Sequence, residues 1–123
     1  MTYFDFEPEE RFRSAWTPII DVYERPTEII VRVELPGVDK SDVRLRWKSD
    51  VLEITGVKRH QTPDQESCRY LCVERQHGRF RRDIAISTAI DFGKSTADLR
   101  NGLLHIRLPK LVDQAADSFI TID

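Results

Sequence analysis

The chain has 123 residues and a formal net charge of −2, with 40% hydrophobic and 33% charged residues, a composition typical of one globular domain. No apolar run reaches the ~18 residues of a membrane-spanning helix, and the first residues lack the basic-then-apolar order of a secretion signal. We therefore expect a soluble, cytoplasmic protein with no charge bias toward nucleic acid or a membrane surface.

Residues 1–18 form the predicted N-terminal arm, which is rich in aromatic side chains. Five of the chain's 11 aromatic residues fall within the first 16 positions: Tyr3, Phe4, Phe6, Phe12 and Trp16. Pro8 can open a short helix that places Phe12 and Trp16 on one face. Two interpretations stay open. The arm either packs onto its own domain or is a flexible apolar segment that contacts other chains.

Residues 19–110 carry the alternation of apolar and polar side chains that is typical of β-strands. The clearest runs lie at 28–35, 43–48 and 103–108. Leu52 and Ile54 follow a break at Ser49-Asp50, which suggests a tight hairpin. Asn101-Gly102 is the strongest hairpin signal, because a type I′ turn needs two residues that accept positive φ.

Phe80, Ile84 and Ile86 form a further apolar row, and Arg82 lies in the same row. An arginine in such a row needs a buried acidic or carbonyl partner. Proline and glycine turn signals separate these runs. Several short strands without a helical period predict an all-β protein, an immunoglobulin-like antiparallel β-sandwich with a flexible arm and a C-terminal tail.

Residues 111–123 form a polar C-terminal extension that ends in Ile120-Thr121-Ile122 and Asp123. In an extended backbone the two isoleucine side chains point the same way, ~6.6 Å apart. The segment is either the closing strand of the sandwich or a free strand whose isoleucines fill a groove on a neighbouring subunit. The ten residues before Ile120 reach at most ~36 Å, enough to cross to another dimer.

Signals for catalysis and for metal binding are weak. Asp91-Phe92-Gly93 and Gly93-Lys94-Ser95 match fragments of kinase and phosphate-loop motifs whose other parts are missing. We therefore expect no enzyme and no cofactor. The two cysteines and three histidines lack the paired spacing of metal ligands, so no metal site is expected either.

The two cysteines, Cys68 and Cys72, would lie ~13 Å apart in an extended segment, too far for a disulfide. They could pair only in a coiled segment or between subunits, and two ordinary thiols are expected. The arginines nearby do not form one patch, because alternation places Arg79 and Arg81 on one face and Arg82 on the other. We expect a solvated strand face that pairs with Glu or Asp on adjacent strands, not a nucleic-acid site.

Four segments, in this order along the chain, resemble the motifs of the small heat-shock proteins and their α-crystallin domain: residues 33–38 with 42–43, 52–56, 74–82 and 97–110. They are similar to the family's V-E-L-P-G-V, L-x-I-x-G, E-R-x-x-G-x-F-x-R and A-x-x-x-N-G-V-L-x-I-x-L-P-K motifs. The match covers about residues 18–110. Ile120-Thr121-Ile122 lies where the family carries its I-x-I tail.

The resemblance implies an ATP-independent holdase that binds unfolding client proteins under stress and leaves refolding to ATP-driven chaperones. It implies a homodimer, formed by exchange of a strand on the dimerisation loop 58–73, and higher oligomers joined by Ile120 and Ile122. The expected dimer interface consists of Arg69, Tyr70, Leu71, Cys72, Val73 and Arg82. For client binding two surfaces are candidates: the apolar arm, through Phe4, Phe6, Phe12 and Trp16, and the groove that Ile120 and Ile122 vacate when they detach. We expect the arm to be the stronger contact.

A second function class stays open beside the first. An adaptor module of the CS-domain type has the same kind of sandwich but docks one defined protein partner. The tail motif at Ile120 and Ile122 and the loop 58–73 argue against it, because the CS family typically carries a different tail.

Overall fold

The computed structural model describes residues 15–60, 67–111 and 122, and these residues form β-strands joined by turns and two short 3-10 helices. The helices are η2 (Lys40–Asp42) and η3 (Phe92–Lys94). The strands are β1 (Ile20–Glu24), β2 (Glu28–Glu34), β3 (Val43–Lys48), β4 (Val51–Lys58), β5 (Gly78–Ala85), β6 (Thr96–Arg100) and β7 (Leu103–Pro109).

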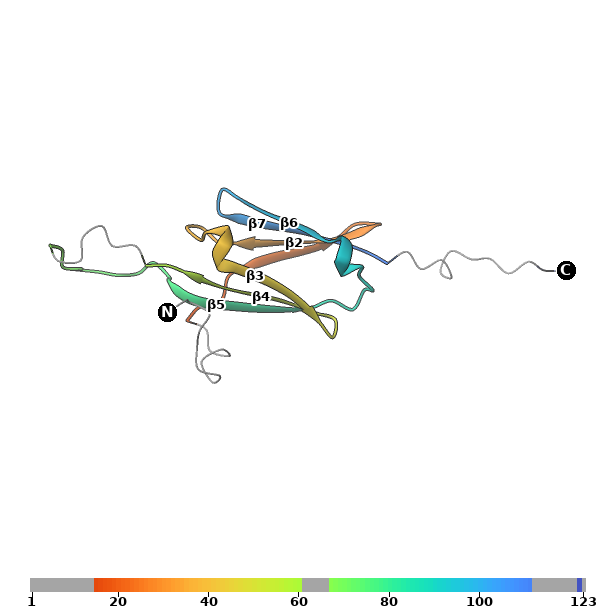
Figure 1. The fold of residues 1–123 in the computed structure, drawn as a ribbon, viewed down its shortest axis with the longest axis horizontal. Coiled ribbons are helices and arrows are strands. Elements are labelled where there is room, and N and C mark those ends of the chain that lie inside the picture. Colours follow the sequence, from red (N-terminus) through yellow and green to blue (C-terminus); the bar gives the residue numbers. More distant parts are fainter. Residues whose placement is uncertain (1–14, 61–66, 112–121, 123) are drawn as a thin grey trace.

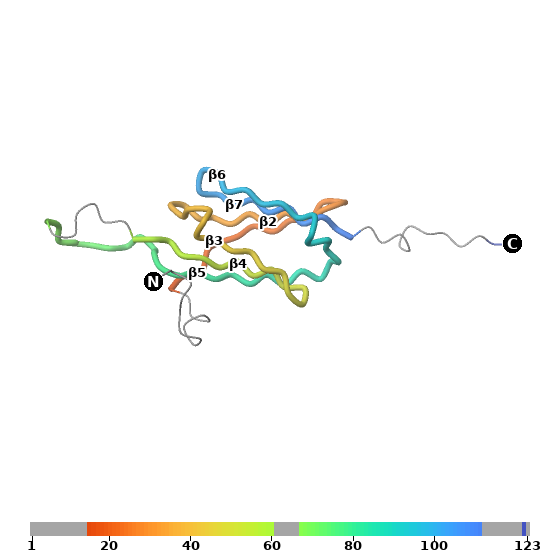
Figure 2. The backbone as a smooth tube through the Cα atoms, in the orientation of Figure 1, coloured from red at the N-terminus to blue at the C-terminus, as the bar shows by residue number. Residues whose placement is uncertain are grey.

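Two antiparallel sheets make up the two layers of the sandwich (Figures 1 and 2). One sheet has the order β1-β2-β7-β6 and the other has the order β3-β4-β5. In the first sheet β2 pairs with β7, so that Val31 lies opposite Ile106 from far along the chain. The predicted all-β sandwich is therefore confirmed.

The core consists of the inward rows of both sheets. In β2 and β7 the alternating residues Val31, Val33, Ile106 and Leu108 are at most 1% exposed. The opposite sheet contributes the inward row of β4 and Phe80 of β5, as the alternation predicts. Each fully buried aliphatic or aromatic side chain contributes about 1.5–3 kcal/mol of transfer free energy, so this row is the main source of stability.

Both predicted hairpins are present. Ser49 and Asp50 have φ of 52° and 62° and connect β3 to β4, and Asn101 and Gly102 have φ of 52° and 76° and connect β6 to β7. Both central residues of each turn thus have positive φ, as the type I′ geometry requires. These turns set the register in which Trp47 pairs with Leu52 and Leu99 with Leu104.

Two features of the packing do not follow from the alternation. Ile30 belongs to the outer row of β2, opposite Tyr23 and Arg107, yet it is 1% exposed. Gly56 sits in the inner row of β4, where a Cβ would collide with the carbonyl oxygen of Asp42 and the ring of Phe80. The close approach explains why this row position of the L-x-I-x-G segment is a glycine.

Candidate functional site

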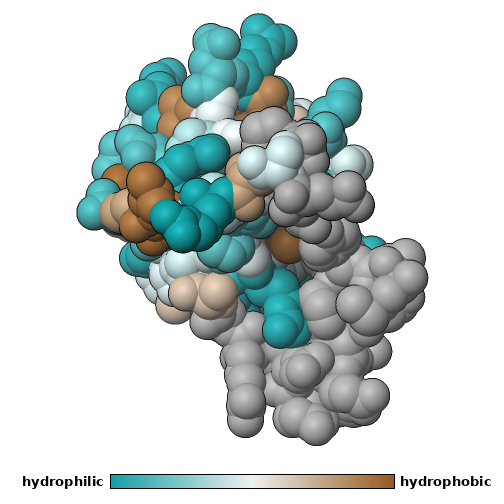
Figure 3. Space-filling view, turned by 90° about the vertical axis from the view of Figure 1, so that its left-hand side faces the viewer, coloured by the Kyte–Doolittle hydropathy of each residue, from teal (hydrophilic) through white to brown (hydrophobic). Residues whose placement is uncertain are grey.

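The segment that precedes β5 projects from one end of the sandwich, opposite the end where the chain leaves β7 (Figure 1). It contains the predicted exchanged strand, Arg69, Tyr70, Leu71, Cys72 and Val73, of which Leu71 is 86% exposed and Tyr70 and Val73 are about half exposed. Figure 3 looks onto this end, where hydrophobic side chains reach the surface among hydrophilic ones. Cys68 and Cys72 are both free and exposed.

Three contacts hold the base of this segment together and tie it to the sandwich. His60 Nε2 lies 3.0 Å from the Tyr70 hydroxyl, and the His60 ring meets the His77 ring edge-on with 4.5 Å between centroids. Arg59, next to His60, donates hydrogen bonds to both carboxylate oxygens of Asp42 at 2.8 Å. The first residues after β4 are therefore anchored to η2, while the tip of the segment is exposed.

Arg82 lies in the inner row of β5, opposite Ile54, and is half-buried. Its Nη1 donates a hydrogen bond to the carbonyl oxygen of Pro18 at 3.4 Å. The partner is thus one of the two kinds that the apolar row predicts, a carbonyl group. This contact ties β5 to the segment that leads into β1.

Of the four aromatic residues predicted to bind clients, Trp16 lies in the described part of the chain, and Phe4, Phe6 and Phe12 lie outside it. The Trp16 ring packs on Phe80 with 5.1 Å between centroids, and its indole N–H donates to the Gly78 carbonyl at 3.1 Å. Ala15 N–H also donates to the Arg79 carbonyl at 2.8 Å. The last residues of the arm therefore add to the edge of β5.

A groove of about 390 Å³ runs between β3 and β6. Its apolar lining is Val43, Leu45, Ala97, Leu99 and Leu104, and the charged residues Lys40, Asp98 and Arg100 line it as well. Ile122 is 92% exposed, so this chain does not bury the second isoleucine of the tail itself. Ile120 lies outside the described residues.

The outer face of the β3-β4-β5 sheet carries charges that pair across the strands. Arg81 of β5 lies 3.1 Å from Glu53 of β4 and 3.0 Å from Asp83. Arg46 of β3 lies 3.7 Å from the same Glu53. The expected pairing of an arginine of this stretch with an acid on an adjacent strand is confirmed for Arg81 and Glu53.

The part of the chain that the structure describes lacks two further features, a cluster of metal ligands and a membrane-spanning helix. No three His, Cys, Asp or Glu side chains there come together as metal ligands would. Nor does that part contain a helix long and apolar enough to cross a bilayer. The described residues present three surface features: a projecting segment, a groove and an aromatic edge.

Sequence reasoning missed the anchor between Arg59 and Asp42, since 17 residues separate the two. Neither position indicates the other without the β3-β4 register.

The family model and the curated relatives that match this chain all point to one protein family. The Hsp20/alpha crystallin family matches residues 21–123. The Rickettsia felis small heat shock protein C4 is 34% identical over 94 residues, which are 76% of this chain and 57% of that protein. The chain spans little more than half the length of the first curated relatives it matches.

Solved structures agree with this. Heat shock protein 16.0 from Schizosaccharomyces pombe has 35% identity and a TM-score of 0.75, covering 88% of this chain and 99% of that one. A small heat-shock protein from Xylella fastidiosa, described as having a distinct high order structure, has 26% identity and a TM-score of 0.71. It covers 89% of this chain and 99% of its own.

Proposed function

The chain belongs to the Hsp20/alpha-crystallin family, and from that premise we propose that it is a cytoplasmic, ATP-independent holdase. In this role it binds partly unfolded proteins under stress, prevents their aggregation and leaves refolding to ATP-driven chaperones. The family match over residues 21–123 carries the proposal. Members of this family are small heat shock chaperones and not enzymes, and an adaptor of the CS-domain type is not favoured.

The display of apolar side chains outside the core supports the proposal physically. An unfolding client exposes apolar surface, and a protein that captures it needs apolar groups that its own core does not use. Leu71 is 86% exposed and Ile122 is 92% exposed, while the sandwich core is already filled. In the proposed mechanism, Phe4, Phe6 and Phe12 of the arm make the main client contacts.

Assembly is part of the same proposal. We expect a homodimer, in which the strand at 69–73 of each chain pairs with the free edge of the partner's sheet. β1 offers such an edge, because it is the outermost strand of the four-stranded sheet and pairs only with β2 among the described strands. Dimers then join when Ile120 and Ile122 of one chain enter the groove between β3 and β6 of another.

The test is suppression of the heat aggregation of a model client, followed by light scattering. We compare the full chain with the triple variant F4S/F6S/F12S, which leaves Trp16 in its contact with Phe80. For the triple variant we expect the chaperone concentration that gives half-maximal protection to rise at least about tenfold. A tenfold loss of client affinity corresponds to about 1.4 kcal/mol of binding free energy.

A matched control is Leu111→Ser, which removes an exposed apolar side chain (52%) from a different place. It should protect as the full chain does. Absence of protection by the unaltered chain would refute the holdase function, and undiminished protection by the triple variant would refute the role of the arm.

A further inference from the structure

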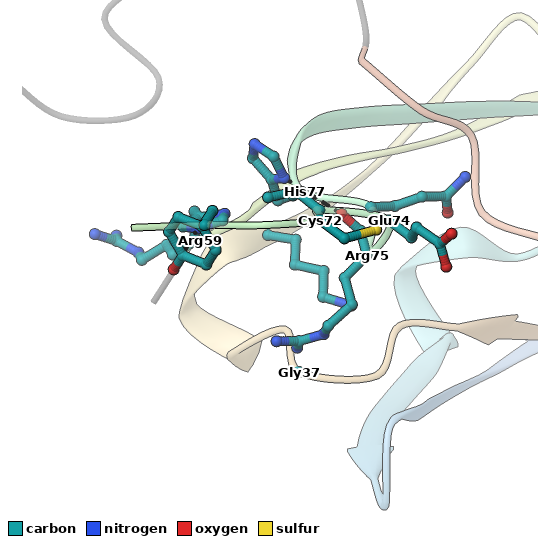
Figure 4. A pocket seen from close by; sticks show the side chains of 11 residues that line it. Gly37, Arg59, Cys72, Glu74, Arg75 and His77 are labelled. Carbon is teal, nitrogen blue, oxygen red and sulfur yellow. Dashed lines mark hydrogen bonds between the residues drawn. The ribbon is translucent and has the colours of Figure 1, made fainter. Parts of the chain in front are cut away.

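A cavity of about 160 Å³ lies at the base of the projecting segment, next to the turn that follows β2 (Figure 4). Gly37 of that turn forms part of its wall. Most of the charged side chains around it are basic: Lys58, Arg59 and Arg75, with His60 and His77 beside them. Among the described lining residues Glu74 is the only acid, and in Figure 4 its side chain extends away from Gly37.

Lys58 and Arg75 converge on one small volume. A Cβ built on Gly37 would lie 3.7 Å from Lys58 Nζ and 3.9 Å from Arg75 Nη2. Figure 4 shows the Arg75 side chain pointing toward Gly37. The two cations come from different elements, since Lys58 ends β4 and Arg75 precedes β5 by three residues. Strand pairing therefore places both at the turn.

Neither cation is neutralised by the described residues. Arg59, Arg81 and Arg107 each have a carboxylate within 3.1 Å, whereas no side chain in the described part pairs with Lys58 Nζ or the Arg75 guanidinium. Burial lowers the pKa of Lys58, and the charge of Arg75 lowers it further. An anion between the two would offset both the desolvation and the repulsion.

We propose that this cavity is an oxyanion-binding site, in which Lys58 Nζ and the Arg75 guanidinium hold a phosphate ion or a carboxylate group. Its volume of about 160 Å³ has room for one such group. The planar guanidinium supplies two parallel donors, and the ammonium supplies a point charge. Lys58 and Arg75 lie outside residues 69–73, but Tyr70, Cys72 and Val73 also line the cavity, so its shape is linked to the segment proposed to exchange. The proposal does not rest on the holdase function.

Titration calorimetry of the full chain with inorganic phosphate, at constant ionic strength in chloride buffer, tests the proposal. The variants are K58Q, R75Q and the control K94Q, which removes the same charge from an exposed position in η3. Wild type and K94Q should bind one phosphate per chain with equal Kd. In K58Q and R75Q the Kd should rise at least about tenfold, because a charge-assisted hydrogen bond is lost.

Two further measurements identify the anion's source and exclude unfolding. K58Q should melt no lower than wild type, because it removes the repulsion between two cations. Native mass spectrometry in rising phosphate then separates the sources. If the number of chains in the wild-type assembly stays the same as phosphate rises, the site binds a free anion. If the wild-type assembly loses chains as the K58Q assembly does, the site binds a carboxylate of a second copy. The proposal is overturned if wild type binds no phosphate and K58Q and R75Q assemble as K94Q does, or if all four chains bind phosphate equally.

Discussion

Asp42 is the one charged side chain that is buried in the described part of the chain, at 5% exposure, and its carboxylate accepts two hydrogen bonds of 2.8 Å from Arg59. The variant D42N keeps the shape of the side chain and removes the charge. We expect the free energy of unfolding at neutral pH to fall by about 1–3 kcal/mol, as measured by urea denaturation. Asp98→Asn on β6 is exposed and should change it by less than about 0.5 kcal/mol.

The difference in free energy of unfolding between wild type and D42N should depend on pH with a definite sign. The hydrogen bonds from Arg59 lower the pKa of Asp42 below its usual 3.8, although burial acts in the opposite direction. Because the folded-state pKa lies below the unfolded one, the contribution is complete above about pH 4 and is lost as pH falls through the folded-state pKa. The gap between wild type and D42N should therefore close at acidic pH. A gap that is the same at all pH values would contradict the assignment.

The sequence predicts the conformation and contacts of some residues better than those of others. Asn101 and Gly102 are predicted because a type I′ turn demands their backbone angles locally. Arg82 is predicted to need a partner, but only the fold brings Pro18 to it. The convergence of Lys58 and Arg75 on Gly37 depends on three separate segments, so no local pattern contains it.

Whole strands also divide into those that the local sequence predicts and those that it does not. β2, β3 and β7 are predicted because their alternation matches the two faces of a sheet with one side buried. β1 is not singled out, since as an edge strand it has no strongly alternating burial: Asp21, Val22 and Glu24 are all exposed. A weakly buried edge leaves little trace in the sequence.

The proposed exchange of residues 69–73 between chains can be tested with proline variants. Proline lacks the backbone N–H that a strand ladder needs, and in an antiparallel pair alternate residues point their N–H groups to the same side. At least one of the variants Y70P and L71P should therefore weaken the homodimer, raising its Kd at least about tenfold. Sedimentation velocity over a dilution series measures this.

The matched control is L71A, which shortens an 86% exposed side chain and keeps its N–H. If L71P weakens the homodimer, L71A should dimerise more tightly than L71P. If both proline variants dimerise as wild type does, residues 69–73 are not the exchanged strand.

At the scale of the molecule, the sequence predicts the class of fold because its signals are local and agree with one another. The motifs at 33–38, 52–56, 74–82 and 97–110 add the family, and the match over residues 21–123 shows it. Assembly is harder to predict from the sequence, because it depends on how a groove on one chain fits a tail on another. The groove joins Val43 and Leu45 of β3 to Leu99 of β6, which lie in different sheets and far apart in the sequence.

Tail and groove can be tested together by native mass spectrometry of the full chain and of a chain truncated after Ser118. If Ile120 and Ile122 join dimers, the truncated chain should stop at the dimer while the full chain forms larger species. Ala97→Glu places a charge in the groove at an exposed position of β6, and a carboxylate buried against apolar side chains is strongly disfavoured. This variant should therefore also stop at the dimer. If truncation dissociates the assembly and A97E does not, the tail binds elsewhere. If neither does, the larger species form without the tail.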